Sequence, residues 1–223
     1  MGRVIVFDVN ETLLDLAVIQ PHFQRVFGDA AIMQQWFALL LHSSLVATLT
    51  TDYVDFGSLA AAALDLVAMR QGITLAEDDR SVILTTLQHL PPHPDVSPSL
   101  DRLRTAGLRL ATLTNSSQGM AGAQLANAGL QDYFEQRLSV EETRRFKPAP
   151  EPYRMAASKL GVPVENLRLV AAHDWDVHGA LHAGSRGAYI ARRGRLYHPL
   201  YTKPDIIGSD LLQVTDRILE LDI

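Results

Sequence analysis

Four short polar segments of the chain carry side chains that could do chemistry together. They are Asp8 in FDVNETLLD, Thr114–Asn115 in ATLTNSS, Lys147 in RRFKPAPEPY and His173–Asp176 in VAAHDWD. The chain contains no cysteine, so covalent chemistry would have to use a carboxylate, a hydroxyl, an amine or an imidazole. A carboxylate at the end of an apolar strand, such as Asp8, can act as a nucleophile, and Lys147 could hold it in its ionised form.

These segments need a scaffold that brings strand ends together, and the pattern after residue 94 predicts one. Short apolar runs alternate there with helical patterns, several of which end at a glycine. We expect strands at 3–7, 108–113, 137–140, 167–172, 187–191 and 204–208, and helices at 99–106, 119–128, 151–160, 177–183 and 211–221. Such repeats predict an α/β fold, a doubly wound parallel sheet whose ligands bind beyond the carboxyl ends of the strands.

The first strand is separated from the others by a helical insertion. Residues 56–69 have apolar positions at helical spacing, and a second helix is expected near Leu75, with three acidic residues at its start. The proline-rich segment PPHPDVSP at 91–98 reads as a hinge. We therefore expect a core domain at 1–14 and 94–223 and a helical cap domain at 15–93.

Composition excludes several classes of function. The chain has 223 residues, 47% of them hydrophobic, and a net charge of −5. This balance disfavours nucleic acid as a partner. The most apolar segment, residues 36–49, is expected to be too short for a membrane span and to form a buried helix. The N-terminal residues lack a signal-peptide pattern, which makes the cytoplasm the expected location.

The four segments, in this order, resemble the haloacid dehalogenase superfamily, and within it most closely the L-2-haloacid dehalogenases of type II. The resemblance covers essentially the whole chain, including the cap, where Trp36 and the segment YVDF at 53–56 are similar to the family's cap helices. It implies a Rossmann-like core, a nucleophilic Asp8 with Thr12 four residues later, and a homodimer formed through cap helices. The other matching motif residues are Lys147, Tyr153, Trp175 and Asp176.

Each remaining polar residue has a role to test. Hydroxyls and amides of Thr12, Asn10, Thr114 and Asn115 could bind the substrate carboxylate and the departing halide. Tyr153 would orient Lys147 or the nucleophile. Asp176 would position or activate water, the alternative being an N-cap of a helix at Val177. His173 could donate a hydrogen bond to the intermediate, help to deprotonate water or bond a neighbour, and Trp175 would form an apolar wall.

Two departures from the family pattern concern the halide. The family's halide-stabilising cap arginine follows a tryptophan, whereas Phe37 follows Trp36 here. Asn10 and Glu11 stand where better-known members have Tyr and Gly. Halide would then contact Asn115, the ring edges of Phe37, backbone N–H groups or another cap residue. The nearby candidates are Arg25, His22 and His42.

The reading that follows is a hydrolase acting on carbon–halide bonds without cofactor or metal. It would convert short L-2-haloacids, haloacetates included, to 2-hydroxy acids through an ester of Asp8. One alternative is a magnesium-dependent phosphatase, which normally needs acids where Asn10 and Ala172 stand, although Asp174 could still reach a metal. The other is a catalytically silent binding module. The basic cluster Arg192, Arg193 and Arg195 reads as a solvated loop.

Overall fold

The computed structural model describes residues 3–223, and its centre is one parallel sheet of six strands. The strand order is β3-β2-β1-β4-β5-β6, and every neighbouring pair is parallel. This confirms the α/β fold with a doubly wound parallel sheet. The strands are β1 (Val4–Phe7), β2 (Arg109–Thr114), β3 (Gln136–Ser139), β4 (Leu167–Ala171), β5 (Arg186–Ile190) and β6 (Ile206–Gly208).

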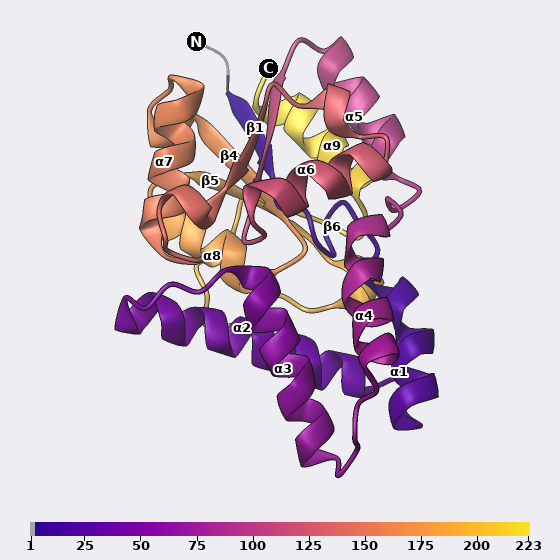
Figure 1. Cartoon of the computed structure of the whole chain (residues 1–223). Coiled ribbons are helices and arrows are strands. Elements are labelled where there is room, and N and C mark those ends of the chain that lie inside the picture. Colours follow the sequence, from indigo (N-terminus) through magenta and orange to yellow (C-terminus); the bar gives the residue numbers. More distant parts are fainter. Residues whose placement is uncertain (1–2) are drawn as a thin grey trace.

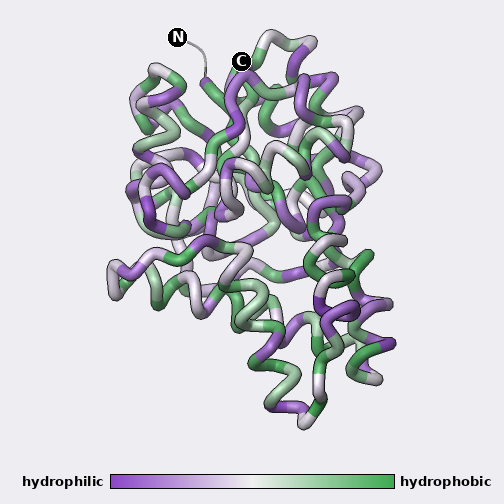
Figure 2. Tube along the Cα trace, in the orientation of Figure 1, coloured by the Kyte–Doolittle hydropathy of each residue, from purple (hydrophilic) through white to green (hydrophobic). Residues whose placement is uncertain are grey.

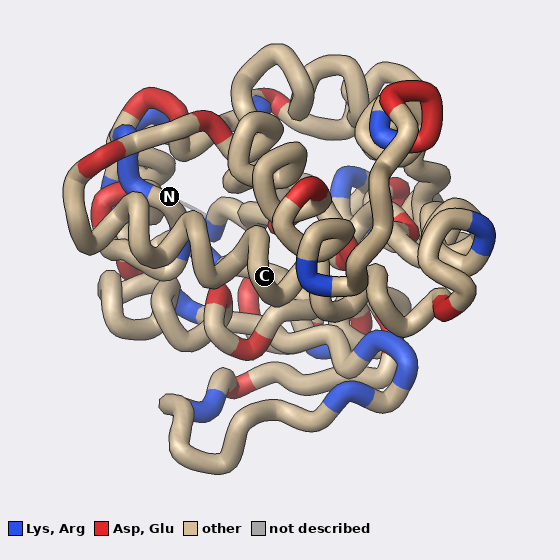
Figure 3. The backbone as a smooth tube through the Cα atoms, turned by 60° about the horizontal axis from the view of Figure 1, so that its bottom comes forward, with Lys and Arg blue, Asp and Glu red and all other residues tan. Residues whose placement is uncertain are grey.

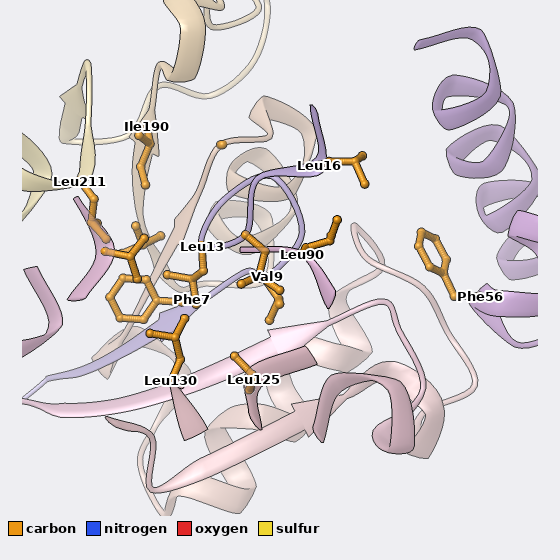
Figure 4. Packing of buried hydrophobic residues seen from close by; sticks show 14 of the residues in the cluster. Phe7, Val9, Leu13, Leu16, Phe56, Leu90, Leu125, Leu130, Ile190 and Leu211 are labelled. Atoms are coloured by element: carbon orange, nitrogen blue, oxygen red, sulfur yellow. The ribbon is translucent and has the colours of Figure 1, made fainter. Parts of the chain in front are cut away.

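Helices cover both faces of the sheet, because successive side chains of a strand point to opposite faces. Ile5 and Phe7 of β1 belong to a cluster with residues of α5, α6 and α9, whereas Val4 and Val6 pack with residues of α7 and α8. Figure 1 shows these two groups of helices on the two sides of the sheet, and Figure 4 shows Phe7 packed beside Leu130. The helices are α5 (Val96–Thr105), α6 (Gln118–Asn127), α7 (Pro150–Leu160), α8 (Asp174–His182) and α9 (Leu211–Leu221).

The helices of the insertion lie together at the end of the sheet where the strands finish, opposite both termini (Figure 1). They share one continuous apolar cluster with the sheet, so the insertion is packed onto the core. The elements are η1 (Leu16–Ile19), α1 (Gln20–Phe27), α2 (Ile32–Thr50), α3 (Phe56–Arg70), α4 (Glu77–Thr86) and η2 (Leu87–His89). We keep the division into a core at 1–14 and 94–223 and a cap at 15–93 as a proposal.

Helix α2 is longer than its sequence pattern predicts. It has 19 residues, beginning four residues before Trp36, and by length and apolar composition it could cross a membrane. The expectation that the segment is too short was therefore wrong. Only part of the helix is buried against the rest of the molecule, 39% of its most apolar window. In that part Trp36 is fully buried and donates from Nε1 to the carbonyl of Ala60 in α3 at 2.9 Å. Figure 2 shows that α2 is green and white over much of its length.

Two helix starts also differ from the expectation. Helix α5 begins at Val96, inside the proline-rich segment, because Pro98 occupies the first turn, where its missing N–H costs no hydrogen bond. Helix α8 begins at Asp174 and not at Val177. Asp176 therefore lies inside the first turn, and the alternative that it is the N-cap residue was wrong.

Candidate active site

The sheet order brings the polar segments to one edge. Strand β1 lies between β2 and β4, so Asp8, Thr114–Asn115 and His173 follow neighbouring parallel strands. Lys147 precedes α7, and its Nζ reaches Asp8 from that loop. The carboxyl ends of parallel strands thus assemble a site from residues that are far apart in the sequence.

Asp8 is buried and held by two donors. Lys147 Nζ lies 2.9 Å from its Oδ1, and Thr12 Oγ1 donates to its Oδ2 at 2.7 Å. Burial by itself would raise the pKa of Asp8. The positive charge of Lys147, with smaller effects of His173 and the Thr12 hydroxyl, outweighs burial and lowers that pKa below its ordinary value. Asp8 is therefore an anion with little access to water, the state that a carboxylate nucleophile needs.

The ammonium group of Lys147 is fully occupied. Besides Asp8, its Nζ donates to Asp176 Oδ2 at 2.6 Å and to the carbonyl of Leu113 at 2.9 Å. A lysine has three N–H donors, so none is left for a substrate. The expectation that Lys147 balances the charge of the carboxylate substrate can hold only through space, without a hydrogen bond.

Tyr153 contacts a different partner from the one expected. Its hydroxyl donates to Asp176 Oδ1 at 2.6 Å and lies 3.1 Å from the carbonyl of the same residue. It bonds neither Lys147 nor Asp8, and it lies behind Asp176, away from the cavity, so the expectation of substrate binding was wrong. This contact depends on Gly179 in α8, since a Cβ there would lie 2.4 Å from Pro148 Cβ and 2.8 Å from the Tyr153 hydroxyl. A glycine inside a helical pattern is the sequence signal of such a close approach.

Burial decides the state of Asp176. Its side chain is fully enclosed, and burial raises its pKa above the ordinary value. The attraction of Lys147 opposes this shift, whereas the negative charge of Asp8 adds to it. Both oxygens of Asp176 have protein partners, and the residue does not line the cavity. Asp176 thus contacts Lys147 and Tyr153 but does not reach the cavity in which a substrate would react with Asp8.

A small cavity lies in front of Asp8. It collects the expected substrate-binding residues other than Tyr153, and the cap contributes only apolar side chains to it. Lys147 and Thr12 lie behind Asp8, and Asp176 behind Lys147. The lining residues are Asp8, Asn10, Phe37, Leu41, Phe56, Thr114, Asn115, His173 and Trp175.

His173 stands between two aromatic rings on one wall of this cavity. Its ring stacks on Trp175 with centroids 5.1 Å apart and on Phe37 with centroids 5.9 Å apart. Its Nε2 lies 3.2 Å from the carbonyl of Asn10 and 3.8 Å from Asp8 Oδ2. Trp175 lines the cavity, where the sequence predicted it as an apolar wall. The aromatic sandwich fixes the plane of the imidazole ring in front of the nucleophile.

No cap cation replaces the expected arginine among the residues that the structure describes around this cavity. Phe37 occupies that side together with Leu41 and Phe56. Arg25 pairs instead with Asp79 at 2.5 Å on the surface, and neither His22 nor His42 lines the cavity. The halide environment on the cap side is consequently apolar.

Sequence reasoning missed a set of ion pairs that fix the loop after Asp8. Arg195 contacts Glu11 at 2.7 Å, Arg193 contacts Asp15 at 2.7 Å, and Arg192 donates to the carbonyl of Thr12 at 2.9 Å. The loop is exposed, as expected for a solvated segment, but its arginines also make these contacts, which the sequence pattern did not predict. The available signal was position, because this cluster follows β5 and so lies at the same edge of the sheet.

The residues present do not fit a magnesium centre. Asn10 donates to Ser116 Oγ and accepts from Gln124, so it supplies no acid. Asp174 accepts a hydrogen bond from its neighbouring backbone N–H and lies outside the cavity of Asp8. Within residues 3–223, no three His, Asp or Glu side chains are grouped so that they could hold a metal ion. We derive no step through a metal.

Comparisons with known proteins agree on one family. The family model described as haloacid dehalogenase-like hydrolase matches residues 3–184. The chain is similar to an (S)-2-haloacid dehalogenase of Xanthobacter autotrophicus, with 31% identity over 86% of this chain and 76% of that one. An (S)-2-haloacid dehalogenase of Pseudomonas putida is 28% identical over 96% of both chains. The solved L-2-haloacid dehalogenase of Xanthobacter autotrophicus, 28% identical, covers both chains completely with a TM-score of 0.89. A second structure of that enzyme, 27% identical over both whole chains with a TM-score of 0.89, has chloropropionic acid covalently bound. The chain therefore belongs to the haloacid dehalogenase-like hydrolases.

Proposed function

We propose that this enzyme hydrolyses L-2-haloacids, haloacetates included, to 2-hydroxy acids through an ester of Asp8. The observation that carries the proposal is the buried, ionised Asp8 facing a small cavity, with its two oxygens held by Lys147 and Thr12. Each oxygen has one strong donor, which leaves it a lone pair for attack. The covalent adduct in the related Xanthobacter enzyme supports the same chemistry.

In the first step an oxygen of Asp8 attacks C2 of the substrate. The new C–O bond forms as the carbon–halogen bond breaks, and the halide leaves with the bonding electron pair. No proton is transferred, so the step needs no general acid. Burial of Asp8 among apolar side chains favours it, because a poorly hydrated carboxylate is a stronger nucleophile.

In the second step water attacks the carboxyl carbon of the ester, and the C2–O bond stays intact. Asp176 is badly placed to activate this water, since both of its oxygens are bonded and it lies behind Lys147. His173 lines the cavity, and if its Nε2–H donates to the carbonyl of Asn10, Nδ1 is a free base. We assign proton removal from water to His173, which then returns the proton to the departing 2-hydroxyl group. Asp176 has the role of orienting Lys147.

Amide and hydroxyl donors bind the two anionic ends of the substrate. Asn115 Oδ1 accepts from the backbone N–H of Lys147 at 3.0 Å, so its Nδ2–H donors are free. Thr114 Oγ1 accepts from the backbone of Ser116, and its own O–H is free to donate. We propose that Thr114 binds the substrate carboxylate, and that Asn115 with the ring edges of Phe37 and Trp175 surrounds the halide. A small halogen suits a cavity walled by these rings.

Neither alternative function is favoured by an observation. A phosphatase would need an acid at Asn10, whose side chain is instead bonded to Ser116 and Gln124. A silent binding module would be indicated if Phe37, Asn10 or His173 lay outside the cavity, and all three line it.

Two further parts of the proposal concern the enzyme in the cell. We propose a homodimer through α2, whose Leu45, Val46 and Leu49 are exposed large apolar side chains. Sedimentation at micromolar concentration should give a dimer, and a monomer alone would contradict it. We also propose a cytoplasmic location, which subcellular fractionation tests. Figure 3 shows Lys and Arg positions and Asp and Glu positions distributed along the chain, and the net charge of −5 disfavours nucleic acid as a partner.

The decisive assay is halide release from L- and D-2-chloropropionate and fluoroacetate, with and without EDTA, beside a phosphoester with Mg²⁺. We expect halide from the L-chloroacid, unaffected by EDTA. Asp8→Asn should abolish release, whereas Asp101→Asn, an exposed control, should not. Phosphoester turnover that EDTA abolishes, without halide release, would overturn the proposal.

Isotopic labelling tests the ester directly. In a single turnover in ¹⁸O-water with excess enzyme, the product hydroxyl should be unlabelled, because its oxygen comes from Asp8, and Asp8 should acquire the label. A labelled product from the first turnover would mean that water attacks C2 directly.

A further inference from the structure

The base of the proposed second step depends on one backbone carbonyl. His173 Nε2 lies 3.2 Å from the carbonyl oxygen of Asn10. A carbonyl can only accept a hydrogen bond, so this contact puts the proton of the neutral imidazole on Nε2 and leaves Nδ1 unprotonated. Only the unprotonated nitrogen can take a proton from water. The position of the Asn10 carbonyl therefore decides which ring nitrogen of His173 is the base.

The loop that carries this carbonyl is held through the side chain of Asn10. Glu11, the next residue, has φ +62°, a backbone conformation that is strained for residues other than glycine. The Asn10 amide makes two hydrogen bonds beside this strained residue. Its Nδ2 donates to Ser116 Oγ at 3.2 Å, and its Oδ1 accepts from Gln124 Nε2 at 3.0 Å. Both partners follow β2, so the two bonds tie the loop after β1 to the neighbouring part of the sheet.

Gln124 is buried in α6, and its amide has a fixed orientation. Its Nε2 also donates to the carbonyl of Leu87 in η2 at 2.7 Å. Because the Leu87 carbonyl can only accept, the amide nitrogen must face it, and the same nitrogen then meets Asn10. No donor among residues 3–223 bonds Gln124 Oε1. The contacts of Gln124 with its neighbours thus use the two N–H donors of the amide and not its oxygen.

We propose that Gln124 is a positioning residue for the hydrolysis of the ester: it holds Asn10, whose carbonyl keeps His173 Nδ1 as the free base. The inference rests on the proposed dehalogenase function and on the role of His173 in it. Gln124 bonds neither Asp8 nor Lys147 and does not line their cavity, so attack on C2 does not require it. Attack of water requires it, because a His173 ring that turns or changes tautomer presents an N–H in place of a lone pair.

Single-turnover kinetics separate the two steps. With excess enzyme and L-2-chloropropionate, halide reports the formation of the Asp8 ester, and 2-hydroxypropionate reports its hydrolysis. Gln124→Met keeps an unbranched side chain of similar size and removes both N–H donors. Since a small misplacement of a catalytic group costs up to about 100-fold, we expect hydrolysis to slow about 10–100-fold and halide release to change less than about twofold. The ester should then accumulate and be visible by intact-protein mass spectrometry.

A matched control lies on the same helix. The Gln118 side chain is exposed, and its amide also donates to a backbone carbonyl, that of Arg137. Gln118→Met should leave both steps unchanged. If Gln124→Met does not fold, Ser116→Ala gives the same test, because it deletes one hydroxyl and breaks the other hydrogen bond of the Asn10 amide. Equal slowing of both steps, or unchanged hydrolysis, would overturn the proposal.

A measurement without turnover tells failure of this inference from failure of the proposed function. The ¹⁵N chemical shifts of the His173 ring, assigned with His173→Leu and recorded where the ring is neutral, report which nitrogen carries the proton. We expect the proton on Nε2 in the native enzyme and in Gln118→Met, and shared between both nitrogens in Gln124→Met. If the native enzyme released no halide, the dehalogenase function would fail, and this change of tautomer would still support the positioning of His173. The same tautomer in the native enzyme and in Gln124→Met would refute it.

Discussion

Replacing Lys147 by methionine tests the electrostatic core of the site. The substitution keeps most of the apolar stem of the side chain and removes three hydrogen bonds, to Asp8, Asp176 and the carbonyl of Leu113. It leaves two buried carboxylates without their shared cation. Since breaking a buried ion pair by removing one partner costs about 3–5 kcal/mol, we expect a loss of that size in the free energy of unfolding at pH 7.

The loss in the free energy of unfolding should depend on pH, and the direction of the pKa shifts decides whether it grows or shrinks as pH falls. In the native enzyme the pKa of Asp8 is lowered, so its ionisation contributes stability that is present above its unfolded pKa and is lost as pH falls. In Lys147→Met, burial without the cation raises the pKa of Asp8 above its unfolded value. The variant then loses stability as pH rises through that raised pKa, and its deficit should shrink from pH 7 to pH 5.

Urea denaturation followed by circular dichroism measures both effects. With an m-value of about 3 kcal/mol/M, the midpoint at pH 7 should fall by about 1–1.7 M. Lys159→Met removes a half-exposed pair with Glu142 and is the matched control, expected to cost less than about 1 kcal/mol. Adding Asp176→Asn to Lys147→Met should restore part of the loss. A cost of Lys147→Met as small as that of the control, with halide release retained, would refute this account of the site.

Three further predictions concern the walls and the loop of the cavity. Phe37→Arg should raise kcat/KM for L-2-chloropropionate about tenfold or more, because a charge-assisted hydrogen bond would meet the leaving halide, whereas Phe37→Leu should not; no gain with arginine would place the halide elsewhere. His173→Leu should lower kcat at least about 100-fold, because it removes the base that we assign to the attacking water; full kcat in the variant would remove His173 from the mechanism. Glu11 has φ +62° and contacts a half-exposed Arg195, so Glu11→Ala, which keeps the strain and loses the pair, should cost about 1 kcal/mol. Glu11→Gly relieves the strain and should cost close to nothing by urea denaturation; equal costs would mean that the backbone is not strained.

The order of elements was predictable because local patterns encode it. The strand at 3–7, the later strands and the closing helix at 211–221 each have a distinct apolar period, and their observed bounds differ by few residues. The residues that follow strands were also predictable as neighbours, because a parallel sheet forces Asp8, Asn115 and His173 to one edge.

Contacts that depend on how two helices pack were not predictable. The bond between Tyr153 and Asp176 exists because Gly179 lets α8 approach Pro148 and Tyr153. The length of α7 and α8 says nothing of that approach. Likewise, Arg195 pairs with Glu11 only because the loop after β5 lies against the loop after β1. No local sequence pattern predicts such a tertiary contact.

The charges of the site determine how it can accept an anion. Asp8 and Asp176 share Lys147, so with both acids ionised the buried group is negative before the substrate arrives. Burial raises the pKa of Asp176, whereas the charge of Lys147 lowers the pKa of Asp8, so Asp176 is the first of the two acids to take up a proton as pH falls. The Tyr153 hydroxyl donates to Asp176 Oδ1 at 2.6 Å and so favours the ionised form of that acid, against the effect of burial.

The raised pKa of Asp176 predicts that Asp176→Asn is a mild change, because burial opposes the charge that the substitution removes. The amide stays neutral, keeps an acceptor for Lys147, and leaves Asp8 as the only buried carboxylate beside that cation. A raised folded pKa means that native stability from the neutral acid is present below the unfolded pKa and declines as pH rises through the folded one. The variant escapes that decline, so its urea midpoint relative to the native enzyme should improve from pH 5 to pH 8. A loss of about 3–5 kcal/mol that grows with pH would instead show that Lys147 requires both carboxylates as anions.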